Sequence, residues 1–503
     1  MIGTSVPEYI FIRLSIWGVR AVTPLSVFYV SLSIADPPVS ALRKALLAWA
    51  VVETSFFVLV YFPRKRSLQS PARHPQSLDR DARQELWSKC VANIPEPETY
   101  LQKWFLGAKS HDIGRENVKE WARWAVFEKG DADAKLGEAE EEELEGYVDG
   151  VEVMLDRKLP PGRGSAKSLR LTVDEVKMLH RPLLWYMTVG LVDTLTAAYL
   201  RYNGFLLYRR PIRQWLRVFP WRICSLFTKR ISPAPPLSYW YRPHTSKTRL
   251  PVLFIHGISM GLYSYAQFLA EISKHDPVSP EDGEIGIIAV EIMPISFRIT
   301  SPILAKQEMV DQITAIVHAH GWERFVLASH SYGSVVMTHL LQTPSFAKMI
   351  GPMVLIDPVT FMLHLPDVCY NFTARPPKGA NEHQLHYFAC TDMMVAHTLA
   401  RHFFWAENIL WKEDVGGRDV TVSLGGRDLI VNTVAVGKYL TGVEWDSEDD
   451  EWKNQEWTGT GLDLVWFPTC DHAQVFERKE GRQRLGDVVR AYAEEKTDVD
   501  GLA

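Results

Sequence analysis

Residues 325–336 read FVLASHSYGSVV, an apolar run that breaks at Ser331 and continues as a helix-like pattern. This order of strand, sharp turn and helix is typical of a turn that holds a nucleophilic serine at its apex. A serine hydroxyl is a weak nucleophile, so it must be lifted clear of the sheet toward a base. Strand and helix nearly touch at such a turn, so the residues two before and two after the serine must be small. Ser329 and Gly333 occupy these positions, with serine where glycine is more common.

The pattern at Ser331 also fits a buried strand followed by a helix that the serine caps. A second segment favours the nucleophile. Residues 250–261 predict an apolar strand that ends in a His-Gly pair and continues as a glycine-containing loop. Such a loop supplies one backbone N–H of an oxyanion hole, and the residue after the nucleophile supplies the other. We therefore predict Ile258 and Tyr332 as the two donors, and we interpret His256 as a packing residue beside the loop.

An acid and a histidine follow the serine along the chain. Residues 419–431 read as strand and turn, with Asp428 just before a helix predicted over 429–440. A carboxylate beyond a strand is well placed to orient an imidazole, and it also fits the common role of a helix cap. The two roles are compatible. Residues 462–476 predict the last strand, then a turn, with His472 opening a helix.

With these motifs in this order, residues 237–495 resemble the α/β-hydrolases, in which the catalytic residues follow the chain order serine, acid, histidine. The resemblance implies that Ser331 is the nucleophile and His472 the general base and acid. It implies that Asp428 fixes the imidazole tautomer. Asp357 remains an alternative acid, because it ends the strand after the serine and some members of the superfamily use that position. The resemblance implies no cofactor.

The same region predicts an α/β fold with a mostly parallel sheet. Near-continuous apolar strands alternate with helical patterns, which implies a sheet covered by helices on both faces. The predicted strands are 238–243, 252–256, 286–292, 324–330, 352–356, 419–424 and 462–467.

Residues 360–417 form an insertion at the place where lids of the resembling enzymes commonly sit. The insertion is rich in aromatic residues and methionine, which predicts an apolar cap over an apolar part of the substrate. The same side chains also fit the cap's own core. Its five histidines show no metal-ligating arrangement, so we interpret them as structural and predict no metal.

The N-terminal part of the chain is apolar. Residues 45–62 carry one charged side chain and approach the roughly 20 residues that span a bilayer. Basic residues 64–66 follow at once, which places the catalytic domain in the cytosol by the positive-inside tendency. Residues 9–34 fit either a first span, with a turn at 36–38 giving a hairpin, or a helix in the membrane interface. Helices buried against the hydrolase domain are the alternative.

Two later segments also suit a membrane. Residues 182–200 are apolar around Asp193, and residues 201–227 mix aromatic residues with six arginines. Apolar and cationic residues at helical spacing suit a membrane surface, and they equally suit amphipathic helices packed on the catalytic core.

The predicted organisation follows from these features. Residues 131–145 are strongly acidic and read as a solvated face or loop, and helices are predicted from about 165 to 228. The expected units are membrane-anchoring helices over 1–62, a basic linker over 63–85, a helical region over 86–231, and a catalytic domain over 232–503 with the cap at about 360–417.

Composition limits the function classes. The chain has 503 residues, is 47% hydrophobic and carries a net charge of −5, which gives no whole-chain signal for nucleic acid. Its five cysteines are odd in number and scattered, without disulfide or metal-ligand spacing, so a reducing compartment fits best.

The leading hypothesis is a membrane-associated serine hydrolase that cleaves a lipid-like or other apolar ester through an acyl-enzyme. Its expected partners are that substrate and a membrane, and its expected location is an endomembrane such as the endoplasmic reticulum or a lipid droplet. An acyltransferase or biosynthetic transesterase with the same triad is the first alternative, because pocket shape and water exclusion choose the acceptor. A membrane scaffold that has kept the fold without activity is the second.

Overall fold

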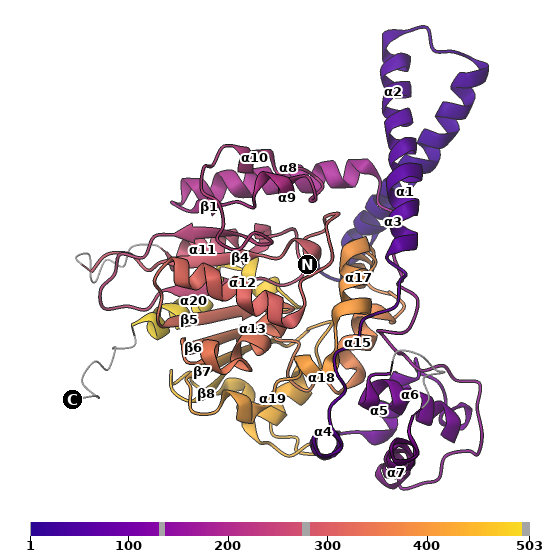
Figure 1. Cartoon of the computed structure of the whole chain (residues 1–503), viewed down its shortest axis with the longest axis vertical. Helices are drawn as coiled ribbons and strands as arrows, with labels where there is room; N and C mark the ends of the chain where they lie inside the picture. Colours follow the sequence, from indigo (N-terminus) through magenta and orange to yellow (C-terminus); the bar gives the residue numbers. More distant parts are fainter. Residues whose placement is uncertain (1, 130–135, 274–281, 495–503) are drawn as a thin grey trace.

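The computed structural model describes residues 2–129, 136–273 and 282–494. Its strands are β1 (Leu206–Tyr208), β2 (Ser238–Arg242), β3 (Val252–Ile255), β4 (Ile287–Glu291), β5 (Phe325–His330), β6 (Ile350–Ile356), β7 (Val420–Gly425) and β8 (Leu462–Phe467). They form one sheet in the order β1-β2-β4-β3-β5-β6-β7-β8 (Figure 1). All pairs from β4 to β8 are parallel, whereas β2 runs antiparallel to both of its neighbours.

The predicted α/β architecture is confirmed. The seven predicted strands are β2 to β8, with ends that agree within two residues. The edge strand β1 was not predicted. It has three residues and directly follows a long helix, so it shows too little alternation to be recognised as a strand.

Neighbouring residues of the parallel strands enter two hydrophobic cores, one on each face of the sheet. Leu327 and Leu355 belong to one core, and the adjacent Ala328 and Val354 belong to the other. This division follows from the period of two along a strand. The covering helices are α12 (Lys306–Ala319), α13 (Gly333–Leu341) and α19 (Thr433–Thr441) on the first face, and α11 (Ala266–Ile272) and α20 (Lys479–Ala493) on the second.

The insertion between β6 and β7 is helical. It contains α15 (Pro366–Thr373), α16 (Ala380–Gln384), a π-helical turn (Leu385–Cys390), α17 (Met393–His402) and α18 (Trp405–Asn408). A second helical unit packs against it, consisting of α4 (Arg80–Ala92), α5 (Pro97–Trp104), α6 (Arg115–Phe127) and α7 (Glu138–Met154). Figure 1 shows the cap helices between this unit and the sheet.

Specific contacts join the helical unit to the cap. Trp405 Nε1 donates a hydrogen bond to the Ala125 carbonyl at 2.8 Å, and Lys103 pairs with Asp367 at 2.7 Å. The predicted acidic stretch, residues 131–145, lies partly outside the described residues. Its described part leads into α7, where acidic side chains suit the first turn of a helix.

An antiparallel helical hairpin projects from the body of the molecule (Figure 1). It consists of α1 (Val6–Ala35) and α2 (Ala41–Phe56), which continues through a π-helical turn (Phe57–Tyr61) into α3 (Phe62–Ser67). The predicted turn at 36–38 lies in the connection between α1 and α2. In each arm, only 17% of an apolar stretch of 18 residues is buried. The alternative of helices buried against the hydrolase domain is therefore wrong. By length and composition, both arms are apolar enough to cross a membrane.

A third helix, α8 (Leu183–Tyr202), is also apolar and long enough to span, but it lies along the body (Figure 1). Its buried Asp193 pairs with Arg222 at 3.0 Å and with Arg298 at 2.9 Å. Arg222 in turn contacts both carboxylate oxygens of Glu291 in β4, at 2.5 and 2.8 Å. Buried charges are stable only when they are paired, so this network fixes α8 to the sheet. The outward face exposes Leu184, Met187, Leu191, Leu195, Tyr199 and Tyr202.

The prediction of helices from about 165 to 228 is wrong outside α8 and two short helices, α9 (Ile212–Trp215) and α10 (Ile223–Leu226). Residues 165–182 are not helical, and prolines at 182, 211 and 220 interrupt the rest. The predicted linker, 63–85, is shared between α3, α4 and an extended segment over 68–79. Arg401 Nε of α17 holds that segment through the Ser70 carbonyl at 2.7 Å.

Candidate active site

Ser331 stands on a sharp turn between β5 and α13. Its φ of 50° lies in the left-handed region, which is strained for a residue with a side chain. A Cβ on Gly333 would lie 2.3 Å from the Ile255 carbonyl oxygen of the neighbouring strand β3, so only glycine allows α13 to begin this close to the sheet. The serine is not a helix cap, because α13 begins without any side-chain cap.

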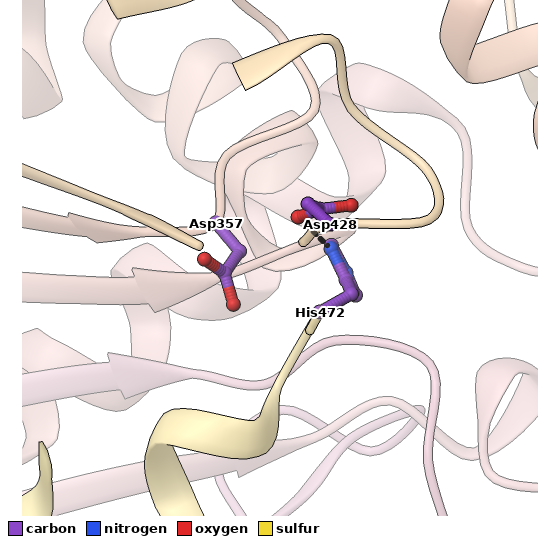
Figure 2. Close-up of side chains that lie close together, drawn as sticks. All are labelled: Asp357, Asp428 and His472. Carbon is purple, nitrogen blue, oxygen red and sulfur yellow. Dashed lines mark hydrogen bonds and ion pairs between the residues drawn. The ribbon is translucent and has the colours of Figure 1, made fainter. Parts of the chain in front are cut away.

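The structure brings the three predicted side chains together. His472 Nε2 lies 2.8 Å from Ser331 Oγ. On the other side of the ring, His472 Nδ1 lies 2.7 Å from Asp428 Oδ2, a contact drawn in Figure 2. Serine and imidazole are both about 95% buried, at 6% and 5% exposure. This is the hydrogen-bond geometry through which an imidazole accepts a proton from a serine while a carboxylate fixes its tautomer.

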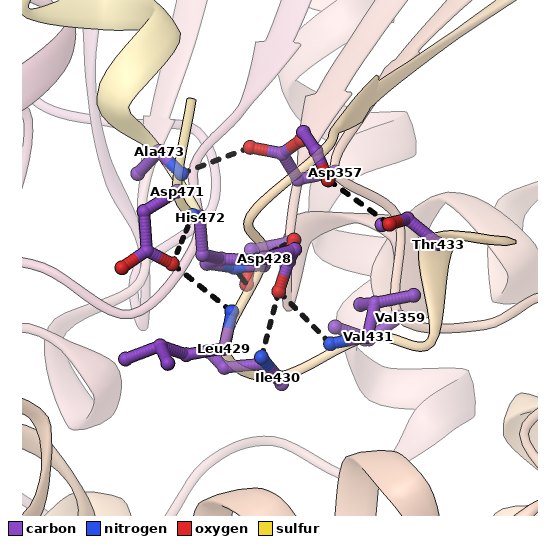
Figure 3. Close-up of polar contacts among 12 residues, drawn as sticks. Asp357, Val359, Asp428, Leu429, Ile430, Val431, Thr433, Asp471, His472 and Ala473 are labelled. Carbon is purple, nitrogen blue, oxygen red and sulfur yellow. Dashed lines mark hydrogen bonds and ion pairs between the residues drawn. The ribbon is translucent and has the colours of Figure 1, made fainter. Parts of the chain in front are cut away.

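A tight loop aims the Asp428 carboxylate. Its Oδ1 accepts hydrogen bonds from the Ile430 and Val431 amides at 2.7 and 2.9 Å, which leaves Oδ2 for the imidazole (Figure 3). The prediction that a helix begins at residue 429 is wrong, because α19 begins at Thr433 behind an Asn432 cap. Asp428 therefore orders a turn and does not cap a helix.

Asp357, the alternative acid, lies close by without a hydrogen bond to His472. Its Oδ2 accepts the Ala473 amide at 2.9 Å and lies 3.7 Å from His330 Nε2. Burial tends to raise the pKa of Asp357, but the two histidines and the amide lower it overall, so the group is ionised. Figure 2 shows its carboxylate beside the pair of His472 and Asp428.

Asp357, Asp428 and His472 also form a group that can in principle ligate a metal, since their donor atoms all lie within 4.8 Å of one another. Both imidazole nitrogens are already engaged, one by Asp428 and the other by Ser331. A metal ligand must present a free lone pair, so binding an ion here would break the contact to the serine or to the acid.

The charges around His472 alter its protonation. Burial lowers the pKa of His472, but Asp428, followed by Asp357 and Asp471, raises it overall to about 9. The resting imidazole is thus protonated at neutral pH. It must lose that proton before it can act as a base toward Ser331.

This pKa predicts an alkaline onset of activity. Only the neutral imidazole accepts the serine proton, and its share rises about tenfold per pH unit below the pKa. We expect kcat/KM for an ester to rise from about pH 7 and to level off above about 9. Because Asp357 raises the pKa of His472, Asp357→Asn should shift the onset to lower pH, whereas Asp487→Asn, an exposed control on α20, should not. A flat profile between these pH values would contradict the assignment of His472.

The two predicted oxyanion donors lie at the serine. Among the described residues, neither the Ile258 nor the Tyr332 amide donates to a protein acceptor, so both are free for a ligand. Both residues line a small cavity together with Ser331. A Cβ on Gly257 would lie 2.7 Å from the Ser331 Cβ, so only glycine allows this loop to approach the serine.

His256 stabilises this loop through hydrogen bonds. It is fully buried, with Nε2 accepting the Ile292 amide at 2.9 Å and Nδ1 lying 2.6 Å from the Gly257 carbonyl oxygen. Burial lowers its pKa to about 4, so the ring is neutral. This agrees with the packing role that the sequence suggests.

Asp471 was not predicted as part of the site. It accepts hydrogen bonds from the His472 and Leu429 amides, at 2.7 and 3.0 Å, and thereby ties the histidine loop to the acid loop (Figure 3). It also accepts Asn381 Nδ2 of the cap at 2.7 Å. Its position next to His472 was the only signal in the sequence.

The cap closes the cavity at the serine. The cavity measures about 40 Å³, far below the roughly 300–1,000 Å³ of a typical ligand pocket. Its wall is almost entirely apolar, and it includes Phe372, Leu399 and Phe403 from the cap. Leu171, from the non-helical segment before α8, also lines it, a contribution that no sequence pattern indicated.

No protein-family model and no curated protein matches the chain. Solved structures that are similar include a bacterial membrane phospholipase A (12% identity, TM-score 0.39, covering 62% of this chain and 94% of the other). Two Bacillus subtilis proteins, a carboxylesterase and a naproxen esterase, are each 12% identical, with TM-scores of 0.32 and 0.33. They cover 59% and 50% of this chain, and 97% and 86% of their own.

The sheet order and the strand–turn–helix at Ser331 define the class: the chain has the α/β-hydrolase fold, as the motifs predicted. The comparisons concern this fold and leave the activity to be argued from the site itself.

Proposed function

We propose that this protein is a membrane-associated serine hydrolase that cleaves an apolar or lipid-like carboxylic ester. The observation that carries the proposal is the chain of hydrogen bonds from Ser331 Oγ through His472 to Asp428, at 2.8 and 2.7 Å. The serine in this chain stands in a strained turn beside two free amides.

The geometry supports a two-step reaction. His472 Nε2 takes the Ser331 proton as the oxygen attacks the ester carbonyl, and the Ile258 and Tyr332 amides stabilise the resulting oxyanion. The intermediate expels the alcohol, which receives the proton from His472. Water, activated by the same imidazole, then releases the acid and restores the serine. None of these steps requires a cofactor.

An apolar substrate suits the wall of the cavity. A lipid tail buried against Phe372 and Phe403 would gain roughly 25 cal/mol per Å² of apolar surface removed from water. Because the present cavity is much smaller than a pocket for a lipid tail, the cap must move before a tail can enter.

The exposed apolar surfaces support membrane attachment. The hairpin exposes apolar side chains on both arms, and α8 exposes a stripe of six on the face turned away from the sheet. In Figure 1 the hairpin and α8 extend in different directions. Both apolar surfaces are buried in lipid if the hairpin is inserted in the bilayer and α8 lies on the bilayer surface. By the positive-inside tendency, basic residues 64–66 favour a cytosolic hydrolase domain, and the location that we propose is an endomembrane such as the endoplasmic reticulum or a lipid droplet.

A panel of esters tests the proposal. The full chain in detergent micelles should hydrolyse p-nitrophenyl esters, with kcat/KM rising several-fold for each added pair of methylenes, since each buried methylene contributes about 0.8 kcal/mol. Equal rates for butyrate and dodecanoate would contradict an apolar acyl pocket. No turnover of any ester, with no acyl-enzyme in the mass spectrum, would favour a scaffold.

The same assay separates hydrolysis from acyl transfer. Reactions run with a competing long-chain alcohol should yield mainly free acid if water is the acceptor. A product dominated by the new ester would assign the acyltransferase instead.

A further inference from the structure

A large cavity opens beside the candidate active site. It measures about 1,120 Å³ and lies between the extended segment after the hairpin, the start of α12, the nucleophile helix α13 and the end of α17. Cavities of this size accept whole small ligands. Tyr332 lines both this cavity and the small apolar one at Ser331, so it forms part of the wall of each.

The wall of the large cavity is cationic. It carries five lysine and arginine residues and two glutamates. Among the residues that the structure describes, none of the five cations forms an ion pair. The five cations are Arg64, Arg73, Arg217, Lys306 and Arg401, and the two acids are Glu308 and Glu407.

Backbone carbonyls hold two of these cations in place. Arg401 is 5% exposed and donates from Nε to the Ser70 carbonyl at 2.7 Å, and Arg64 donates to the Thr300 carbonyl. Carbonyls position a guanidinium without neutralising it. With five cations and two glutamates, the wall keeps a net positive charge, which a bound anion would offset.

We propose that this cavity binds the phosphate group of a lipid whose ester is presented to Ser331. Phosphate is the anion that arginine clusters recognise best. Arg64 lies in α3, where the hairpin meets the body, so the cavity opens at the point where a lipid would leave the bilayer. A headgroup on one side of Tyr332 and an acyl chain on the other would place the ester between them.

This inference rests on the proposed function and narrows its substrate to phosphate-bearing lipids. A soluble phosphate compound offers the same chemistry. The hairpin and the apolar pocket beyond Tyr332 favour the lipid, and the experiment separates the two sources.

The test compares two substrates with the same acyl chain, 1-oleoylglycerol 3-phosphate and 1-oleoylglycerol, in neutral detergent micelles. Wild type should prefer the phosphate ester by kcat/KM. The double variant Arg73→Gln/Arg217→Gln should lower that preference by about tenfold for each arginine–phosphate pair it removes. Both arginines are exposed and have no side-chain partner among the described residues, so the exchange breaks no internal interaction.

The matched control is Arg66→Gln/Arg213→Gln. These arginines are exposed in the neighbouring turns and do not line the cavity. The control should keep the wild-type preference. An equal loss in both double variants would show general attraction to anionic micelles and would overturn the site, as would a wild type without preference.

Binding distinguishes failure of this inference from failure of the proposed function. Ser331→Ala protein should bind the phosphate lipid, and the arginine double variant on that background should bind it about tenfold or more weakly. If no lipid is hydrolysed but this difference holds, the function fails and the site stands. If inorganic phosphate competes at millimolar concentration while the lipid gains nothing from its tail, the cavity serves a soluble phosphate and the lipid assignment is wrong.

Discussion

Ser331→Ala should abolish ester hydrolysis and covalent labelling by a fluorophosphonate probe. Among the residues that the structure describes, the hydroxyl is the only hydrogen-bond partner of His472 Nε2, at 2.8 Å, so its removal leaves the base with nothing to activate. Loss of a serine nucleophile lowers kcat by roughly 10⁵- to 10⁶-fold where the triad acts as a unit. The measurements are initial rates on a p-nitrophenyl ester and probe labelling of purified protein.

Ser329→Ala is the matched control. Ser329 lies two residues earlier on the same strand, is fully buried, and donates only to the Met337 sulfur, so it cannot reach the substrate. The control should keep labelling, and circular dichroism should show both variants folded. Labelling of the Ser331→Ala protein at the wild-type level would mean that another residue is the nucleophile.

Asp428→Asn should lower kcat by about 10⁴-fold, the loss expected when an amide stabilises the wrong imidazole tautomer. The 2.7 Å contact from His472 Nδ1 to Asp428 Oδ2 makes this carboxylate the tautomer-fixing group. The amide keeps an oxygen for the Ile430 and Val431 amides, so the loop should retain its shape. Steady-state kinetics near the pH optimum of each variant would measure the effect.

Asp357→Asn is the comparison that decides between the two acids. Asp357 contacts the Ala473 amide and not the imidazole, so this variant should keep kcat within about tenfold of wild type at high pH. If Asp357→Asn were the more damaging exchange and Asp428→Asn were tolerated, the acid would have been assigned to the wrong strand.

The central sheet could be predicted from the sequence because its strands are buried on both faces. Segments such as 252–255 and 353–356 are apolar without interruption, and turn residues bound them clearly. The edge strand β1 lacks this signal, because an edge strand is short and half-exposed. Helix ends were harder to predict. In the sequence Asp428 resembles a helix cap. In the structure its carboxylate contacts the His472 imidazole, and Asn432 caps the helix instead.

The triad could be predicted because each member is local to a recognisable strand end. The supporting residues could not. Asp471 works by joining three segments that are far apart along the chain, at residues 381, 429 and 472. Leu171 reaches the serine cavity from a segment without regular structure. The orientation of α8 depended on the ion pairs of Asp193, which only the fold brings together.

The contact between α17 and the base of the hairpin has a mechanical consequence. Met393 and Met394 of the cap share one hydrophobic cluster with Tyr61 and Leu68, on either side of α3. Because these side chains pack together, α17 cannot move away from the serine cavity without disturbing its contacts with the base of the hairpin. With the hairpin inserted in a bilayer, as proposed, a change in bilayer thickness or stiffness would act on the cap over the serine cavity, and the rate of the proposed reaction would then depend on bilayer tension as well as on substrate concentration.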